Sequence, residues 1–137
     1  MQTLEGHSGW VQAAAFSPNG GQLASASGDT TVRVWDVALG ATAQTLRGHS
    51  RSVCFVASSM NGKQLASASE DTTVRIWNTD TGAPVQTLNS RSDWVYAMAF
   101  SPDGKQLALT WGSTTVRVLK IAMGAILQTL ESHLGLI

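Results

Sequence analysis

The chain has 137 residues with nine basic and nine acidic side chains, so its formal net charge is zero. This length fits one domain, and the balanced charge argues against a nucleic-acid binder, which carries a basic excess. No apolar run reaches the ~18 residues of a membrane span, and the single cysteine excludes an intrachain disulfide and a thiolate metal site. We therefore expect a cytoplasmic protein that binds neither nucleic acid nor membrane and holds no cofactor or metal.

The first predicted elements are four short extended runs, at 10–16, 22–27, 31–35 and 43–47. Glycine-containing turns at 18–21 and 28–30 separate the middle runs and favour tight chain reversals. None of the runs is long or periodic enough to predict a helix. Small and β-branched residues occupy both alternating faces, which is typical of a sheet covered on both sides. The pattern predicts a four-stranded antiparallel meander.

The same pattern then repeats along the chain. The dipeptide Thr3-Leu4 recurs at residues 45, 87 and 129, always 42 residues on. Residues 3–44 and 45–86 match without a gap and are identical at more than half of their positions. The chain therefore consists of three tandem units and the start of a fourth. A meander of this length repeated in tandem predicts the blades of a β-propeller.

The signature positions of the first two units resemble the WD-repeat pattern, and they are Gly6-His7, Ser27, Asp29 and Trp35-Asp36, then Gly48-His49, Ser69, Asp71 and Trp77-Asn78. The low divergence is similar to that of the amplified arrays in fungal NACHT-type incompatibility proteins and their bacterial relatives. The resemblance implies an all-β fold of three four-stranded antiparallel blades, at about 6–47, 48–89 and 90–131. Residues 1–5 would be a spare outer strand and 132–137 a tail. The whole chain, 1–137, would then be one WD-repeat domain.

The resemblance also implies the strand positions in the later units. They are 52–58, 64–70, 73–78 and 85–89 in the second blade, and 94–100, 106–112, 115–120 and 127–131 in the third.

The resemblance further implies one buried hydrogen-bond network in each of the first two blades, formed by His7, Ser27, Asp29 and Trp35 and by His49, Ser69, Asp71 and Trp77. The same residue types make the Ser-His-Asp triad of hydrolases. We reject that interpretation because a copy in consecutive blades indicates a stabilising device, and neither serine lies in a glycine-flanked nucleophile turn. We expect no enzymatic activity.

The third unit differs at all four network positions, which hold Arg91, Trp111, Ser113 and Leu119. A partly satisfied buried network costs more than none, so the joint loss is expected once one member changes. We expect apolar packing in this blade, with Trp111 and Leu119 filling the space. The alternative is a decayed or disordered third blade.

In the resembled family, partners bind on one rim of the ring, beside the signature positions. The variable residues at those positions are Trp10, Gln12, Ser52, Cys54, Glu70, Trp94 and Tyr96. Aromatic residues are enriched in interface hot spots, which favours a role in binding. The alternative is that Trp10 and Trp94 pack between blades. The repeated arginines at 33, 75 and 117 are expected to pair with nearby acids, and the alternative is a phosphate-binding stripe.

Three blades leave two apolar sheet faces without a neighbour, and such faces predict association. We expect a non-catalytic scaffold that binds a protein or peptide and self-assembles into a closed propeller. A homotrimer of nine blades is favoured over a homodimer of six, with residues 2–5 of one copy completing the third blade of the next. The alternative is an excised fragment of a longer WD-repeat array with a purely structural role.

Overall fold

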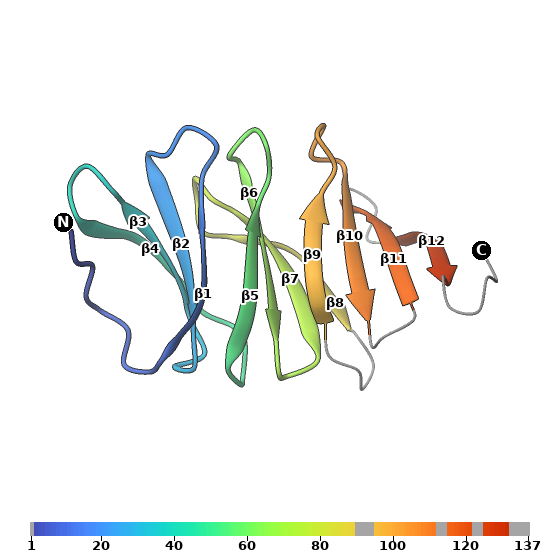
Figure 1. The fold of residues 1–137 in the computed structure, drawn as a ribbon, viewed down its shortest axis with the longest axis horizontal. Coiled ribbons are helices and arrows are strands. Elements are labelled where there is room, and N and C mark those ends of the chain that lie inside the picture. The colour runs from blue at the N-terminus through green and yellow to red at the C-terminus, as the bar shows by residue number, and fades with distance from the viewer. Residues whose placement is uncertain (1, 90–94, 112–114, 122–124, 132–137) are drawn as a thin grey trace.

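The computed structural model describes residues 2–89, 95–111, 115–121 and 125–131. Three four-stranded antiparallel sheets follow one another along the chain (Figure 1). Their strands are β1 (Val11–Phe16), β2 (Gln22–Ser27), β3 (Val32–Asp36), β4 (Ala41–Leu46), β5 (Val53–Ser58), β6 (Gln64–Ser69), β7 (Thr73–Asn78), β8 (Pro84–Asn89), β9 (Val95–Phe100), β10 (Gln106–Trp111), β11 (Thr115–Lys120) and β12 (Ala125–Glu131). The all-β expectation and the three four-stranded blades are confirmed, and the strand ends differ from the expected ones by no more than two residues.

Each sheet is a meander in which every strand pairs with the next one in the chain. The first strand of the middle sheet, β5, contacts both β1 and β9, so the first strands of the three blades lie side by side. Figure 1 shows the three sheets standing next to one another in chain order, with β1–β4 at one end and β9–β12 at the other. The blades therefore form an open row in which only the middle blade has two neighbours.

A β-bulge lies at the start of the first strand of each blade. In the first blade Val11 pairs with Ser27 and Ala13 with Ala26, so Gln12 has no partner across the sheet. The register shifts in the same way around Cys54 and around Tyr96. A bulge inserts one unpaired residue and turns its side chain away from the regular alternation. Three of the seven predicted binding residues thus lie at bulges.

Two apolar clusters join the blades. One face of the first blade, which we call its trailing face, carries Ala24, Val32 and Val34 and packs against the opposite, leading face of the second blade. The residues of that leading face are Val53, Leu65 and Trp77, and each is 1% exposed or less. The second cluster joins the trailing face of the second blade to the leading face of the third in the same way. The core of the protein therefore lies between the sheets.

The two outer sheet faces lack this cover. On the leading face of the first blade Val11 is 57% exposed, whereas its counterpart Val53 is 0% exposed. Phe16 on the same face is 62% exposed. On the trailing face of the third blade Val116 and Val118 are half-buried, although the matching valines of the first blade are buried. The row of blades thus ends in two apolar faces that elsewhere in the molecule pack against each other.

Residues 2–5, expected to be a spare outer strand, form no strand in this structure. Gln2 is held instead by a 2.7 Å hydrogen bond from its side-chain nitrogen to the backbone oxygen of Val37. The physical reason is the absence of a pairing partner. The matching segment Thr129–Glu131 pairs with β11, the strand that precedes it in the chain. Among the described residues no strand precedes residues 2–5, so they have no such partner.

Candidate functional site: two buried networks and an inner-strand pocket

A chain of hydrogen bonds links four side chains inside the second blade. The indole nitrogen of Trp77 donates to Ser67 Oγ over 2.8 Å, and that oxygen lies 2.7 Å from His49 Nε2. His49 Nδ1 lies 3.0 Å from Asp71 Oδ2. The Asp71 carboxylate can only accept, so Nδ1 carries the hydrogen and donates to it. In the neutral imidazole Nε2 then accepts from the Ser67 hydroxyl, whose oxygen accepts from the indole. The network is satisfied with a neutral imidazole.

The first blade contains the same network. Trp35 donates to Ser25 Oγ over 2.9 Å, Ser25 Oγ lies 2.6 Å from His7 Nε2, and His7 Nδ1 lies 2.8 Å from Asp29 Oδ2. The turn between β2 and β3 positions the aspartate, and Thr31 supports it through both its backbone nitrogen and its hydroxyl. The loop before β1 supplies the histidine. Four segments therefore meet at each network, namely this loop, two neighbouring strands and the turn between them, and the network ties the blade together.

The expected network serines, Ser27 and Ser69, were the wrong ones, since Ser25 and Ser67 hold that position. Leu23 pairs with Trp35 across β2 and β3. The indole therefore reaches Ser25, two positions after Leu23, but not Ser27 at the end of the strand. Ser27 lies at the end of β2, where its Oγ accepts from the backbone nitrogen of Asp29 over 3.0 Å. Ser69 does the same for its own turn. These serines support the turn rather than the indole.

In the second blade the electrostatics favour a charged Asp71 beside a neutral His49. Burial raises the pKa of Asp71, but hydrogen bonds from Thr73, from the Ser50 backbone and from His49 outweigh that effect and hold the pKa well below its usual range. Asp29 behaves in the same way. Burial lowers the pKa of His49 below 6.5, although the Asp71 carboxylate opposes this effect.

The network geometry is also that of a Ser-His-Asp triad, but burial prevents nucleophilic chemistry at it. Ser67 is 0% exposed and Ser25 is 5% exposed, so a substrate carbonyl has no path to either hydroxyl. Each hydroxyl oxygen also accepts the indole hydrogen, which makes it a poorer nucleophile. These constellations stabilise the blades.

In the third blade leucines occupy the positions of the serine and the tryptophan. Leu109 corresponds to Ser67 and Leu119 to Trp77, and both are 0% exposed. The expected apolar packing around Leu119 is therefore present, and Leu109 contributes to it. Arg91, Ser113 and the side chain of Trp111 lie outside the described residues.

The arginine expectation was wrong at residue 33. Arg33 donates to Thr42 Oγ1 over 3.1 Å, and its guanidinium lies 5.8 Å from the centre of the Trp35 ring. A cation over an aromatic face is itself a favourable contact. The side chain therefore covers the indole of the first network rather than pairing with an acid.

A pocket of about 340 Å³, which we call the inner-strand pocket, opens where the first strands of the three blades meet. Its apolar wall contains Phe55, Ala68 and Val95, and its polar edge contains Gln12 and Glu70. Cys54 also lines it, and burial and the nearby Glu70 raise the pKa of this thiol, which keeps it protonated. Ser69 completes the lining.

The structure thus gathers three predicted binding residues, Gln12, Cys54 and Glu70, around one cavity. Ser52 does not line this pocket, but its carbonyl oxygen accepts hydrogen bonds from two residues that do, through the Ser69 hydroxyl and the Glu70 backbone nitrogen.

Trp10 is 84% exposed, so in this structure it does not pack between blades. Trp94 and the side chain of Tyr96 lie outside the described residues. Phe55, which lines the inner-strand pocket, was missed because it follows the bulge and does not flank a signature residue. Its difference from its counterparts Ala13 and Ala97 was the signal that could have found it.

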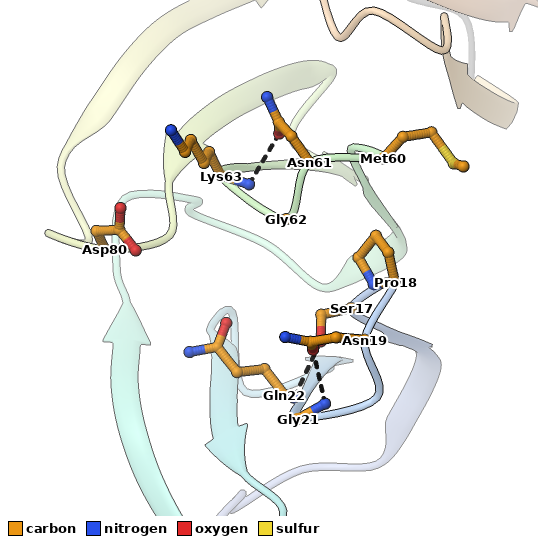
Figure 2. Close-up of a pocket in the computed structure, with 10 residues that line it drawn as sticks. All are labelled: Ser17, Pro18, Asn19, Gly21, Gln22, Met60, Asn61, Gly62, Lys63 and Asp80. Atoms are coloured by element: carbon orange, nitrogen blue, oxygen red, sulfur yellow. Dashed lines mark hydrogen bonds between the residues drawn. The ribbon is translucent and has the colours of Figure 1, made fainter.

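A second pocket of about 480 Å³, the turn pocket, lies at the opposite ends of the same strands (Figure 2). It is polar, with Asn19, Asn61, Lys63 and Asp80 among its lining residues. Within the described part of the chain, no group of His, Cys, Asp and Glu is arranged to hold a metal ion. The same residues include no helix long and apolar enough to cross a membrane.

Comparison with solved structures shows the same arrangement of strands. A crystal structure of the WD40 repeats of RRP9 superposes with a TM-score of 0.88 at 27% identity, covering 96% of this chain and 41% of that one. A structure of U3-55K gives the same score and identity and is covered over 42% of its length.

Curated relatives match over about one repeat. A Notchless protein homolog from Arabidopsis thaliana is 61% identical over 36 residues, which is 26% of this chain and 8% of the relative. A pre-mRNA-splicing factor from Emericella nidulans is 44% identical over 41 residues, which cover 30% of this chain and 9% of the relative. A vegetative incompatibility protein from Podospora anserina is 51% identical over 39 residues, or 28% of this chain and 3% of its own. The chain therefore spans less than a tenth of the length of these relatives.

The family model described as "WD domain, G-beta repeat" matches residues 1–36, 40–78 and 82–118. The matched residues make up most of the chain and fall once in each of its three units. Together with the four-stranded blades and the networks that recur in two of them, this match shows that the chain belongs to the WD-repeat family of β-propellers.

Proposed function

We propose that this chain is a non-catalytic scaffold that binds a protein or peptide partner and completes its propeller by head-to-tail association of copies. WD-repeat proteins generally act as protein-interaction scaffolds, and the inner-strand pocket offers a site for that role. Association in a ring follows from the two uncovered faces at the ends of the row. Three copies and nine blades are preferred to two copies and six, because near-identical blades accommodate wide rings.

The observation that supports association is the match between the two end faces. The exposed leading face of the first blade carries Val11 at the position where the second blade carries the fully buried Val53. The half-buried trailing face of the third blade carries Val116 at the position of the buried Val32. The same two kinds of face pack together twice within the chain. A second copy therefore presents the surface that each end lacks.

The partner site is the inner-strand pocket. Its apolar wall suits one inserted apolar side chain, and Glu70 at its edge suits a neighbouring donor or cation. We expect the partner to be a protein segment with an apolar residue next to a basic one. The exposed indole of Trp10 lies on the same rim and adds area of the kind that anchors interfaces.

Two variants with opposite defects test the association. Val11→Asp places a charge on the leading end, and Val116→Asp places one on the trailing end. Each variant alone is expected to be monomeric, whereas their mixture forms a capped dimer of twice 14.5 kDa through the two unaltered ends. Val85→Asp, at a 48% exposed position of the outer strand β8, is the control and leaves assembly intact. A mixture that stays monomeric would overturn head-to-tail association.

The recognition role needs a separate experiment. Peptides selected from a displayed library for binding to the chain should combine an apolar and a basic residue, and Glu70→Lys should abolish their binding. Lys63→Glu in the turn pocket is the matched charge reversal at the opposite rim and should leave it unchanged. Binding that survives Glu70→Lys, or a selection that yields no peptide, would contradict a partner site in the inner-strand pocket.

The alternative is a structural segment within a longer array of blades. Its support is the small share of each relative that this chain spans, 8% of the Notchless homolog and 41% of the RRP9 structure. In that case the blades on either side would cover the end faces, and the chain by itself would not form a discrete assembly in solution.

A further inference from the structure

Two turns that line the turn pocket carry the dipeptide Asn-Gly. Asn19-Gly20 follows β1 and Asn61-Gly62 follows β5, and both asparagines are exposed. In each turn the glycine has a positive φ, 74° at Gly20 and 72° at Gly62. No heavy atom lies within 4 Å of the place where a side chain of Gly20 would begin. No side chain therefore crowds the backbone at Gly20, whose nitrogen donates to the Ser17 carbonyl oxygen over 2.9 Å.

The side-chain oxygen of each asparagine accepts two hydrogen bonds. Asn19 Oδ1 accepts from the backbone nitrogen of Gly21 over 2.8 Å and from Ser17 Oγ over 2.9 Å. Asn61 Oδ1 accepts from Lys63 N over 3.0 Å, as Figure 2 shows, and from Ser59 Oγ over 2.7 Å. Among the described residues neither amide nitrogen, Nδ2, has a hydrogen-bond partner. The carbonyl is held and polarised, while the leaving nitrogen is unrestrained.

We propose that Asn19 and Asn61 are sites of self-catalysed deamidation promoted by their turns. The backbone nitrogen of the following glycine attacks Cγ, the Cγ–Nδ2 bond breaks, and ammonia leaves with the proton of the glycine nitrogen. Water then opens the resulting succinimide to aspartate or isoaspartate. Negative charge develops on Oδ1 during the attack, where two donors already point, and preplaced donors at a developing oxyanion accelerate acyl chemistry.

The third blade shows that the aspartate product fits the turn. Asp103 occupies the matching position, and its Oδ1 accepts from Ser101 Oγ over 2.6 Å and from Lys105 N over 2.9 Å. The glycine that follows keeps the bond from its nitrogen to the Ser101 carbonyl oxygen at 2.9 Å, the same length as in the other two turns. Conversion to aspartate therefore preserves the turn, and the carboxylate that results is a poor electrophile that does not react further at a comparable rate.

Conversion changes the charge of the turn pocket. The carboxylate of Asp80 and the ammonium of Lys63 already lie there. Each conversion adds one negative charge beside them, and two conversions take the formal net charge from zero to −2. The turn pocket then becomes acidic, while the inner-strand pocket at the other rim keeps its own charge.

Peptide mapping by mass spectrometry during incubation at mildly alkaline pH tests the proposal. Conversion is expected at Asn19 and Asn61 and not at Asn78, the internal control. Asn78 Oδ1 likewise accepts from a backbone nitrogen, that of Asp80 at 2.9 Å, but the next residue is the β-branched Thr79. Conversion of the folded chain should be at least as fast as that of the same chain unfolded in urea.

Matched variants separate the role of the turn from that of the dipeptide. Ser17→Ala removes one donor and should slow conversion at Asn19 about fivefold, the effect of one exposed hydrogen bond, with the rate at Asn61 unchanged. Ser17→Thr keeps the donor and should keep the rate, and circular dichroism confirms that both variants are folded. Slower conversion in the folded chain than in urea, or equal rates for Ser17→Ala and the unaltered chain, would overturn the proposal.

Discussion

The indole nitrogen of Trp77 and the hydroxyl oxygen of Ser67 are joined by a 2.8 Å hydrogen bond between neighbouring strands of the second blade. The same oxygen lies 2.7 Å from His49 Nε2, so one hydroxyl satisfies two buried groups. Removing it leaves a buried donor and a buried acceptor without partners. This dependence makes Ser67 the most sensitive polar position in the blade.

Ser67→Ala should lower the free energy of unfolding by about 2–3 kcal/mol, because each orphaned buried group costs about 1–3 kcal/mol. Ser69→Ala removes the acceptor for the Asp71 nitrogen and the donor to the Ser52 carbonyl, at a half-buried position; it should cost about 1 kcal/mol and is the matched control. Urea unfolding followed by far-ultraviolet circular dichroism measures both. A larger loss for Ser69→Ala would contradict the assignment of Ser67 to the network.

The error in choosing the serine shows where sequence reasoning ends. The run Ser25-Ala26-Ser27 offers two hydroxyls on the same face of β2, and only the pairing of Leu23 with Trp35 decides which one the indole reaches. Histidine, aspartate and tryptophan were predictable because each network member stands at the same place in the first two units, 42 residues apart. The strands were predictable because turn residues separate them.

The binding rim shows a similar division. The variable columns pointed to Gln12, Cys54 and Glu70, which line one pocket in the structure. The reason that Gln12 and Cys54 reach it is a bulge, and a shift of register leaves no signal in composition. The exposure of Trp10 was open for a different reason, since it depends on whether a blade covers that face.

Leu109→Ser should not rebuild a network in the third blade. The introduced hydroxyl would lie among apolar side chains, with Leu119 where the other blades have an indole donor. The loss of leucine packing and the unpaired hydroxyl together should lower the free energy of unfolding by about 3 kcal/mol. Leu39→Ser, at a 78% exposed position, should change it by less than about 0.5 kcal/mol. Equal stability of the two variants would contradict the packing of Leu109.

The stability should fall as the pH drops below 6.5. Burial lowers the pKa of His49 in the folded state, with Asp71 opposing, so the unfolded chain takes up a proton first as the pH falls through 6.5. The contribution of neutral His49 is thus complete above that pH and is lost as the pH approaches the folded pKa. Denaturant titrations at several pH values measure the slope. His49→Gln should flatten it, and an unchanged slope in that variant would contradict the assignment.

Thr30→Asn should stabilise the first blade. Thr30 has a φ of 77°, a left-handed conformation that is costly for a β-branched residue and tolerated by asparagine. The expected gain in the free energy of unfolding is about 1 kcal/mol. Thr31→Asn is the control and should destabilise, because Thr31 is 6% exposed and its hydroxyl donates to Asp29 over 2.6 Å. Thermal unfolding of the two variants gives shifts of opposite sign if the account is right.

The mass of the unaltered chain in solution tests the central claim most directly. Light scattering behind a sizing column should give a discrete species of three times 14.5 kDa, in which each leading face covers a trailing face of the next copy. A mass of twice 14.5 kDa would keep the head-to-tail ring and contradict the preference for nine blades. A mass of 14.5 kDa at every concentration would contradict self-assembly itself, since both apolar end faces would then remain in water.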